Sequence, residues 1–228
     1  MIRVTENLRV IRDLLAQASS DAQRGDQPVK LLAVSKKQPI SAISEATDAG
    51  QRDFGENFVQ EGVEKIAASG RDDLVWHFIG HLQANKTRQV AEHFDWVHTV
   101  DRIRIARRLS EQRPAERGEL QVCLQVNIDD EASKSGIAVD DVMSLAAAVA
   151  ELPRLRLRGL MCLPASRDNF DEQREPFARM RQLLESLQRV GIAVDTLSMG
   201  MSGDYRAAIY EGSTIVRIGT AIFGTRPT

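Results

Sequence analysis

Cysteine is scarce in this sequence, and its scarcity excludes two kinds of stabilising site. The chain has 2 cysteines in 228 residues, and Cys123 and Cys162 each lie inside an apolar run, without a CxxC spacing or a histidine companion. A disulfide framework and a cysteine-rich zinc site both need more thiols at characteristic spacings. We expect two buried, reduced thiols.

Histidine is also sparse, with 4 residues in the chain. His77 and His81 have the spacing of a helical ligand pair, but "VWHFIGH" has the pattern of a strand that runs into a loop. In that conformation the spacing does not bring two rings onto one ion. We therefore expect no metal site.

The sequence lacks a charge excess, a long apolar run and a linker. Its 30 lysines and arginines nearly balance its 32 acidic residues, so the charge gives no reason to expect nucleic acid or a membrane as partner. The first residues, "MIRVTENLRVIRDLL", are charged throughout, unlike a signal peptide, and no uncharged run approaches the length of a membrane span. We expect a monomeric, cytoplasmic protein with a single domain over residues 1–228.

What the sequence does contain is an alternation of strand and helix patterns. An amphipathic helix is predicted from about Thr5 to Ser19, and eight short apolar runs follow it. The runs are "VKLLAVSK", "RDFGE", "VWHFIG", "WVHTV", "LQVCLQVNI", "LRLRGLMCL", "TLSMG" and "STIVRIGTAIFG". Helical patterns between them begin near Ser41, Asn57, Lys86, Arg102, Asp140, Asn169 and Gly203. This order predicts an α/β fold, a single (β/α)8 TIM barrel with an extra N-terminal helix.

One predicted strand favours the barrel over the structural alternative, a doubly wound open sheet. In "QVCLQVNI", apolar residues such as Val122 and Leu124 alternate with more polar ones such as Gln121 and Gln125. An open sheet covered by helices on both faces would bury the polar side under apolar helix surface. A barrel can instead direct that side towards a site at its centre.

Two loops rich in glycine and hydroxyl residues fall where such barrels often hold phosphate, after strands seven and eight. The segment "SMGMSGDY" brings Ser202 and Gly203 to the start of a predicted helix, where free backbone N–H groups attract an anion. The segment "RIGTAIFG" adds Gly219 and Thr220, which allow close backbone approach and supply a hydroxyl donor. Either segment alone is typical of an ordinary turn, but both together indicate a phosphate site.

Two adjacent lysines, Lys36 and Lys37, end the first predicted strand and so share this face of the barrel. A lysine whose pKa is lowered by desolvation or by a neighbouring cation becomes a nucleophile and can form a Schiff base with a carbonyl group. Strand alternation lets one of the pair point inward and does not say which. Arg217 lies among apolar residues and needs a partner, either a core carboxylate or a ligand. Lys134 is a further candidate cation, although a solvated loop lysine is the more ordinary interpretation.

A carbonyl-reactive lysine, a phosphate site and an inward cation together indicate pyridoxal 5'-phosphate (PLP), which has an aldehyde, a phosphate and a ring nitrogen. An aldolase acting on a phosphorylated sugar would use the first two of these features. It is the alternative that the residues alone leave open.

Six segments closely resemble the pyridoxal-phosphate homeostasis proteins, the YggS-like group. They are "LLAVSKKQP", "FGENFVQE", "WHFIGHLQANK", "LQVNIDDEASKSGI", "LRGLMCLP" and "LSMGMSGDYRAAIYEGSTIVRIGTAIFG". The resemblance is collinear from about Leu31 to Gly224. It implies a barrel similar to the N-terminal domain of alanine racemase, with PLP bound covalently to Lys36. The predicted cofactor-binding residues are Lys36, Asn57, Ser198, Met199, Ser202, Gly203, Arg217, Gly219 and Thr220.

Two features argue against strong catalysis. The resemblance places Arg217 towards the pyridine nitrogen, and because a guanidinium does not readily give up its proton, the ring would be a weak electron sink. Alanine racemase has a further domain that supplies a catalytic tyrosine, whereas here Tyr205 and Tyr210 are the only tyrosines and share one predicted helix. We expect a PLP homeostasis protein without strong catalysis, with transient contact with PLP-dependent apoenzymes left open. A PLP-dependent amino-acid racemase is the alternative.

Overall fold

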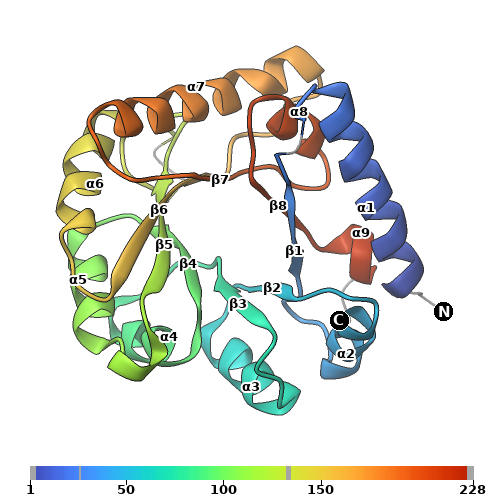
Figure 1. Ribbon diagram of the computed structural model, residues 1–228, viewed down its shortest axis with the longest axis horizontal. Helices are drawn as coiled ribbons and strands as arrows, with labels where there is room; N and C mark the ends of the chain where they lie inside the picture. Colours follow the sequence, from blue (N-terminus) through green and yellow to red (C-terminus); the bar gives the residue numbers. More distant parts are fainter. Residues whose placement is uncertain (1–3, 26, 132–134, 225–228) are drawn as a thin grey trace.

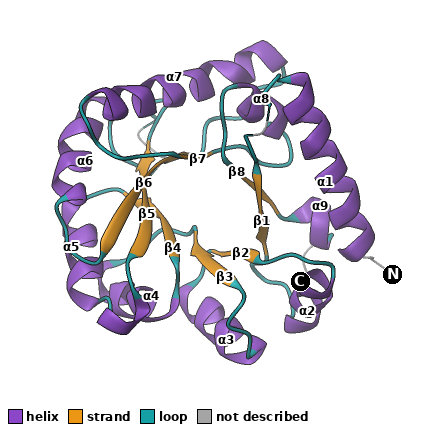
Figure 2. Cartoon of the chain, viewed as in Figure 1, coloured by secondary structure: helices purple, strands orange, loops and turns teal. Residues whose placement is uncertain are grey.

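The computed structural model describes residues 4–25, 27–131 and 135–224, and within them eight parallel strands close into a barrel. Each strand pairs with the next along the chain, and the last pairs with the first. The strands form a central ring that the helices surround (Figures 1 and 2). In chain order they are β1 Lys30–Val34, β2 Asp53–Glu56, β3 Val75–Phe78, β4 Trp96–Val100, β5 Leu120–Val126, β6 Leu155–Cys162, β7 Thr196–Ser198 and β8 Ile215–Ile218. The predicted barrel is confirmed, and each strand falls within its predicted run.

The helices on the outside begin close to the predicted positions. They are α1 Val4–Asp21, α2 Ile40–Asp48, α3 Val59–Ser69, α4 Thr87–His93, α5 Ile103–Gln112, α6 Val142–Ala150, α7 Phe170–Arg189, α8 Tyr205–Tyr210 and α9 Thr220–Phe223. Short 3-10 turns, η1 Ala84–Lys86, η2 Ala115–Arg117 and η3 Val139–Asp141, lie between them. Asn169 caps α7, since its side-chain oxygen accepts a hydrogen bond from the Asp171 N–H at 2.8 Å. Within the described residues, no helix is long and apolar enough to cross a membrane.

The end of the chain corrects one prediction. The run "STIVRIGTAIFG" was predicted to carry the last strand, with Gly219 and Thr220 at its end, but β8 ends at Ile218 and the run continues as a helix that was not predicted, α9. Ile222 and Phe223 are buried in the outer core, and the Asn7 side chain donates a hydrogen bond to the Ile222 carbonyl at 2.8 Å. The chain therefore turns outward to pack on α1. The helix α1 packs beside α8, α9 and α2 on this side of the barrel (Figure 1).

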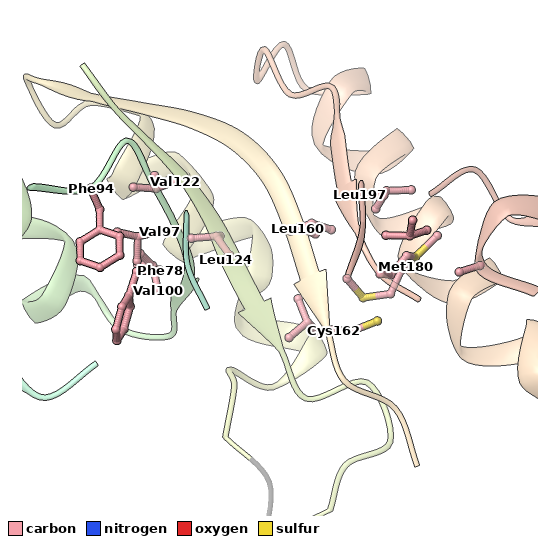
Figure 3. Packing of buried hydrophobic residues seen from close by; sticks show 14 of the residues in the cluster. Phe78, Phe94, Val97, Val100, Val122, Leu124, Leu160, Cys162, Met180 and Leu197 are labelled. Atoms are coloured by element: carbon pink, nitrogen blue, oxygen red, sulfur yellow. The ribbon is translucent and has the colours of Figure 1, made fainter. Parts of the chain in front are cut away.

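The strands separate two apolar cores. The larger one lies between strands and helices, and Figure 3 shows Val122 and Leu124 of β5 within it, with Met180 of α7 farther along the same layer. A smaller cluster, made by Leu32, Trp96, Cys123, Met161 and Ile215, fills the middle of the barrel. The predicted alternation of β5 is thus confirmed. Both cysteines are buried as expected, neither is in a disulfide within the described residues, and burial raises the pKa of Cys123 to about 12.

Candidate functional site

A cavity of about 570 Å³ opens at the carboxyl ends of the strands, within the size range of small-molecule sites. Its wall includes six of the predicted residues, namely Lys36, Asn57, Ser202, Arg217, Gly219 and Thr220. A larger hollow of about 840 Å³ lies at the opposite end, beside α1. Two of its cations, Lys30 and Arg52, are paired with Asp53 and Asp73, and barrels of this kind place their chemistry at the carboxyl ends of the strands. We therefore take the 570 Å³ cavity as the candidate site.

The backbone brings Lys36 rather than Lys37 to this cavity. Leu32 belongs to the inner cluster, and both Val34, the last residue of β1, and Lys36 line the cavity. Lys37 is exposed, outside the cavity wall, and has a positive φ of 60°. The two lysines sit in a tight turn closed by a hydrogen bond from the Gln38 N–H to the Ser35 carbonyl at 3.0 Å. We call residues 35–38 the lysine turn.

A cluster of ionic side chains holds the backbone of the lysine turn through hydrogen bonds. The Lys65 ammonium donates to the Ser35 carbonyl at 2.7 Å, to Glu56 Oε1 at 2.8 Å and to Glu61 Oε1 at 2.6 Å. Glu61 also accepts the Lys37 N–H at 2.5 Å, and Glu56 accepts the Ser35 hydroxyl at 2.6 Å. Burial raises the pKa of Glu56, against the opposing effect of Lys65. These four side chains, Ser35, Glu56, Glu61 and Lys65, form what we call the Lys65 cluster.

Arg217 is a buried cation with one face at the cavity. Its Nη1 donates to the Ser198 carbonyl at 2.6 Å and to the Ser198 hydroxyl at 2.8 Å, while Nη2 donates to the Cys162 carbonyl at 2.9 Å. Within the described residues no carboxylate lies within ion-pair distance of this guanidinium, and burial lowers its pKa. Of the two partners that the sequence left open, a core carboxylate is therefore not found in the described part of the chain.

Three predicted residues lie outside the cavity wall. Ser198 stands behind Arg217, as its hydrogen-bond acceptor. Met199 is buried in the outer core, and its carbonyl accepts the Ser213 hydroxyl. Gly203 is exposed on the loop before α8. Lys134, the other candidate cation, lies outside the described residues.

Other residues of the cavity wall were not among the predicted cofactor-binding residues. Gln125 lines the cavity from the polar side of β5, and His81 lines it from the loop after β3. Thr99 lies in the wall as well, and its hydroxyl donates to the Gly80 carbonyl at 2.7 Å. Part of the Lys65 cluster could have been noticed in the sequence, because Glu61 and Lys65 are four residues apart on α3. That spacing is also typical of an exposed ion pair, so it does not indicate a buried cluster.

Gly80 marks a close approach between two loops of the cavity wall. A Cβ at this position would lie 2.0 Å from the Asn57 carbonyl oxygen, whereas one at Gly203 would meet nothing within 4 Å. Gly80→Ala should therefore push the Asn57 loop away and lower the free energy of unfolding by about 1–3 kcal/mol. The matched variant Gly203→Ala should stay within about 0.5 kcal/mol of the wild type. Urea denaturation measures both, and equal midpoints for the two variants would contradict the close packing.

Comparison with known proteins agrees with the fold. The profile of the family "Alanine racemase, N-terminal domain" matches residues 3–227. The chain is 56% identical to the pyridoxal phosphate homeostasis protein of Escherichia coli K12 over 226 residues, which cover 98% of this chain and 97% of that protein.

Solved structures support the same family and the same fold. PipY of Synechococcus elongatus, with PLP bound, is 36% identical, with a TM-score of 0.84 over 97% of this chain and 100% of that chain. An alanine racemase from Corynebacterium glutamicum, 17% identical, shares the fold with a TM-score of 0.74 over 99% of this chain and 62% of the racemase. The chain thus belongs to the alanine racemase N-terminal domain family and, within it, to the pyridoxal phosphate homeostasis proteins.

Proposed function

We propose that this protein binds PLP in the 570 Å³ cavity, holds it covalently on Lys36 and serves PLP homeostasis without strong catalysis of its own. The observation that carries the proposal is the position of Lys36 in the same cavity wall as Arg217, Ser202 and Thr220. The relationship to PipY, whose structure holds PLP, supports the choice of cofactor.

The polar groups of the cavity fit this cofactor. The buried Asn57 Oδ1 has no hydrogen-bond partner within the described residues, and Asn57 lines the cavity. A buried, unpaired amide is costly unless a ligand satisfies it. The hydroxyls of Ser202 and Thr220 can donate to a phosphate, and Arg217 can donate to a ring nitrogen.

PLP supplies an aldehyde for covalent attachment when bound. The chain's own contribution is to present one amine to that aldehyde. Lys36 would hold PLP through that aldehyde, and its amine would supply the nitrogen of the Schiff base. The Lys65 cluster holds the backbone of the turn from which Lys36 extends, which fixes where this side chain enters the cavity.

Borohydride reduction of the protein mixed with PLP tests the covalent part of the proposal. The reduced adduct should map to the peptide that contains Lys36, and the unreduced protein should show visible absorption. An adduct confined to another lysine would overturn the assignment of Lys36. A yellow, PLP-containing protein would also exclude the phosphosugar aldolase.

The alternative, an amino-acid racemase, is favoured by one observation. His81 lies in the cavity wall, and a histidine can exchange protons during a reaction. Incubation with a panel of L- and D-amino acids separates the two functions. Sustained turnover would remove the proposal of a non-catalytic protein. That this protein is a monomer, and that it contacts PLP-dependent apoenzymes, are predictions that the structure does not test.

A further inference from the structure

A chain of polar side chains crosses the barrel interior from its amino-terminal end to the cavity. His77 Nε2 lies 3.0 Å from Asp53 Oδ1, and His77 Nδ1 lies 2.9 Å from His98 Nε2. His98 Nδ1 lies 2.8 Å from the Ser198 hydroxyl, which accepts a hydrogen bond from Arg217 at 2.8 Å. Both rings and Ser198 are fully buried. We call Asp53, His77, His98 and Ser198 the polar relay.

The end near Asp53 can only accept hydrogen bonds. Burial acts to raise the pKa of Asp53, but the hydrogen bonds from His77 and Lys30 and the positive charge of Lys30 outweigh it and lower that pKa. Lys30 Nζ lies 2.7 Å from the carboxylate oxygen that also faces His77. Asp53 is therefore ionised at neutral pH, and His77 must donate to it from Nε2.

The end near Arg217 can only donate, because a guanidinium has no acceptor atom. Burial lowers the pKa of both histidine rings, so each is neutral and carries one proton. With His77 protonated on Nε2, its Nδ1 must accept from His98 Nε2. His98 Nδ1 must then accept the Ser198 proton. Every hydrogen bond therefore runs in the same direction, from Arg217 to Asp53.

This direction compensates for the burial of Arg217. The guanidinium has only neutral oxygen acceptors within hydrogen-bonding distance in the described part of the chain. In a chain of aligned hydrogen bonds each link polarises the next, and the effect is strongest where water is excluded. The Ser198 oxygen becomes a better acceptor because its own proton is donated to His98. The negative charge of Asp53 thus acts on Arg217 through three intervening side chains.

We propose that the polar relay positions Arg217 and stabilises its buried charge at the cavity, where it sets the hydrogen bonding of the cofactor ring nitrogen. The residues of the relay are positioning residues. The proposal rests on the proposed function for its ligand, although its hydrogen bonds can be tested without any ligand.

The ligand-free test is nitrogen-15 NMR of the histidine rings in the protein without cofactor. His77 and His98 should both be neutral with the proton on Nε2, and single substitutions assign their signals. Asp53→Asn removes the charge at the far end and should shift the His98 Nδ1 signal, although Asp53 does not contact His98. Asp73→Asn, an exposed carboxylate on the loop before β3, should leave that signal unchanged. A charged ring, a proton on either Nδ1, or an unmoved His98 signal in Asp53→Asn would overturn the relay.

The ligand-bound test compares two buried hydroxyls. Ser198→Ala cuts the relay next to Arg217, while Ser213→Ala removes an equally buried hydroxyl that bonds only to backbone carbonyls. Ser198→Ala should shift the visible absorption of bound PLP and its pH profile, and weaken PLP binding about tenfold, as expected for loss of a hydrogen bond to a charged group. Ser213→Ala should keep the wild-type spectrum and pH profile.

The outcomes separate this proposal from the proposed function. If the wild type forms no adduct with PLP, the proposed function fails, and the NMR signals still decide whether the relay exists. If the wild type forms the adduct and Ser198→Ala has an unchanged spectrum and pH profile, the relay does not control Arg217. Equal spectral shifts in both alanine variants would assign the effect to general loosening of β7 and β8 and would also overturn the proposal.

Discussion

Lys36→Ala should abolish covalent attachment of PLP, while Lys37→Ala should retain it. Among the described residues of the cavity wall, Lys36 is the one lysine, and alanine has no amine to condense with an aldehyde. Lys37 lies next to it in sequence but points to solvent. Visible absorption before borohydride reduction, and the mass of the intact chain after it, measure the covalently bound fraction. The expected change is complete loss in one variant and none in the other.

The pair of variants is a matched control because both remove one lysine from the same turn. Circular dichroism checks that both are folded, which is expected because the Lys65 cluster holds the turn through the Ser35 carbonyl and the Lys37 N–H. Alanine at position 37 keeps that N–H. An adduct that persists in Lys36→Ala, or is lost in Lys37→Ala, would show that the cavity does not select the reactive amine.

The fold could be predicted because each of the eight strands corresponds to a separate apolar run in the sequence. The alternation in β5 indicated one side for the helices and another for the barrel interior, and the structure confirms this for Cys123 and Gln125. The weakest prediction concerned the last run, where apolar residues continue from β8 into α9. A run of apolar residues is compatible with either conformation, so its pattern could not locate the point where the chain leaves the barrel.

The choice between the two lysines needed the backbone. Alternation holds only within a strand, and β1 ends at Val34, before the lysines. The following turn has a positive φ at Lys37, and this conformation sends the second lysine to solvent. A sequence of two identical residues contains no information on which of them occupies that position.

The polar relay could not be predicted because it depends on how neighbouring strands are aligned. The sequence shows His77 and His98 on two strands, and alternation can point both inward. Whether the rings meet depends on register, and here His77 pairs with Trp96, so His98 lies farther along β4 towards the cavity. That offset places its ring between His77 and Ser198, which comes from β7 on another side of the barrel. The stagger of a closed barrel is a property of all its strands together.

Lys65→Met should lower the free energy of unfolding by about 3–5 kcal/mol, as is typical when one partner of a buried ion pair is removed. The side chain of Glu56 is fully buried, and the variant leaves its charge without a counterion. Arg88→Met is the matched control, because it removes a cation from an exposed helical pair with Glu92 and should cost less than about 1 kcal/mol. Urea denaturation of both variants gives the comparison.

The pH dependence of Lys65→Met identifies the cause of the loss. Burial already raises the pKa of Glu56 in the wild type, and without Lys65 the pKa must rise further. The folded state then binds a proton more tightly than the unfolded state, so stability should increase as pH falls through the raised pKa. Glu56→Gln in the same background should recover part of the loss at neutral pH and remove this pH dependence. A loss that is independent of pH and unaffected by Glu56→Gln would instead come from the missing bond to the Ser35 carbonyl, and the lysine turn would then be held by that contact rather than by the charge of the cluster.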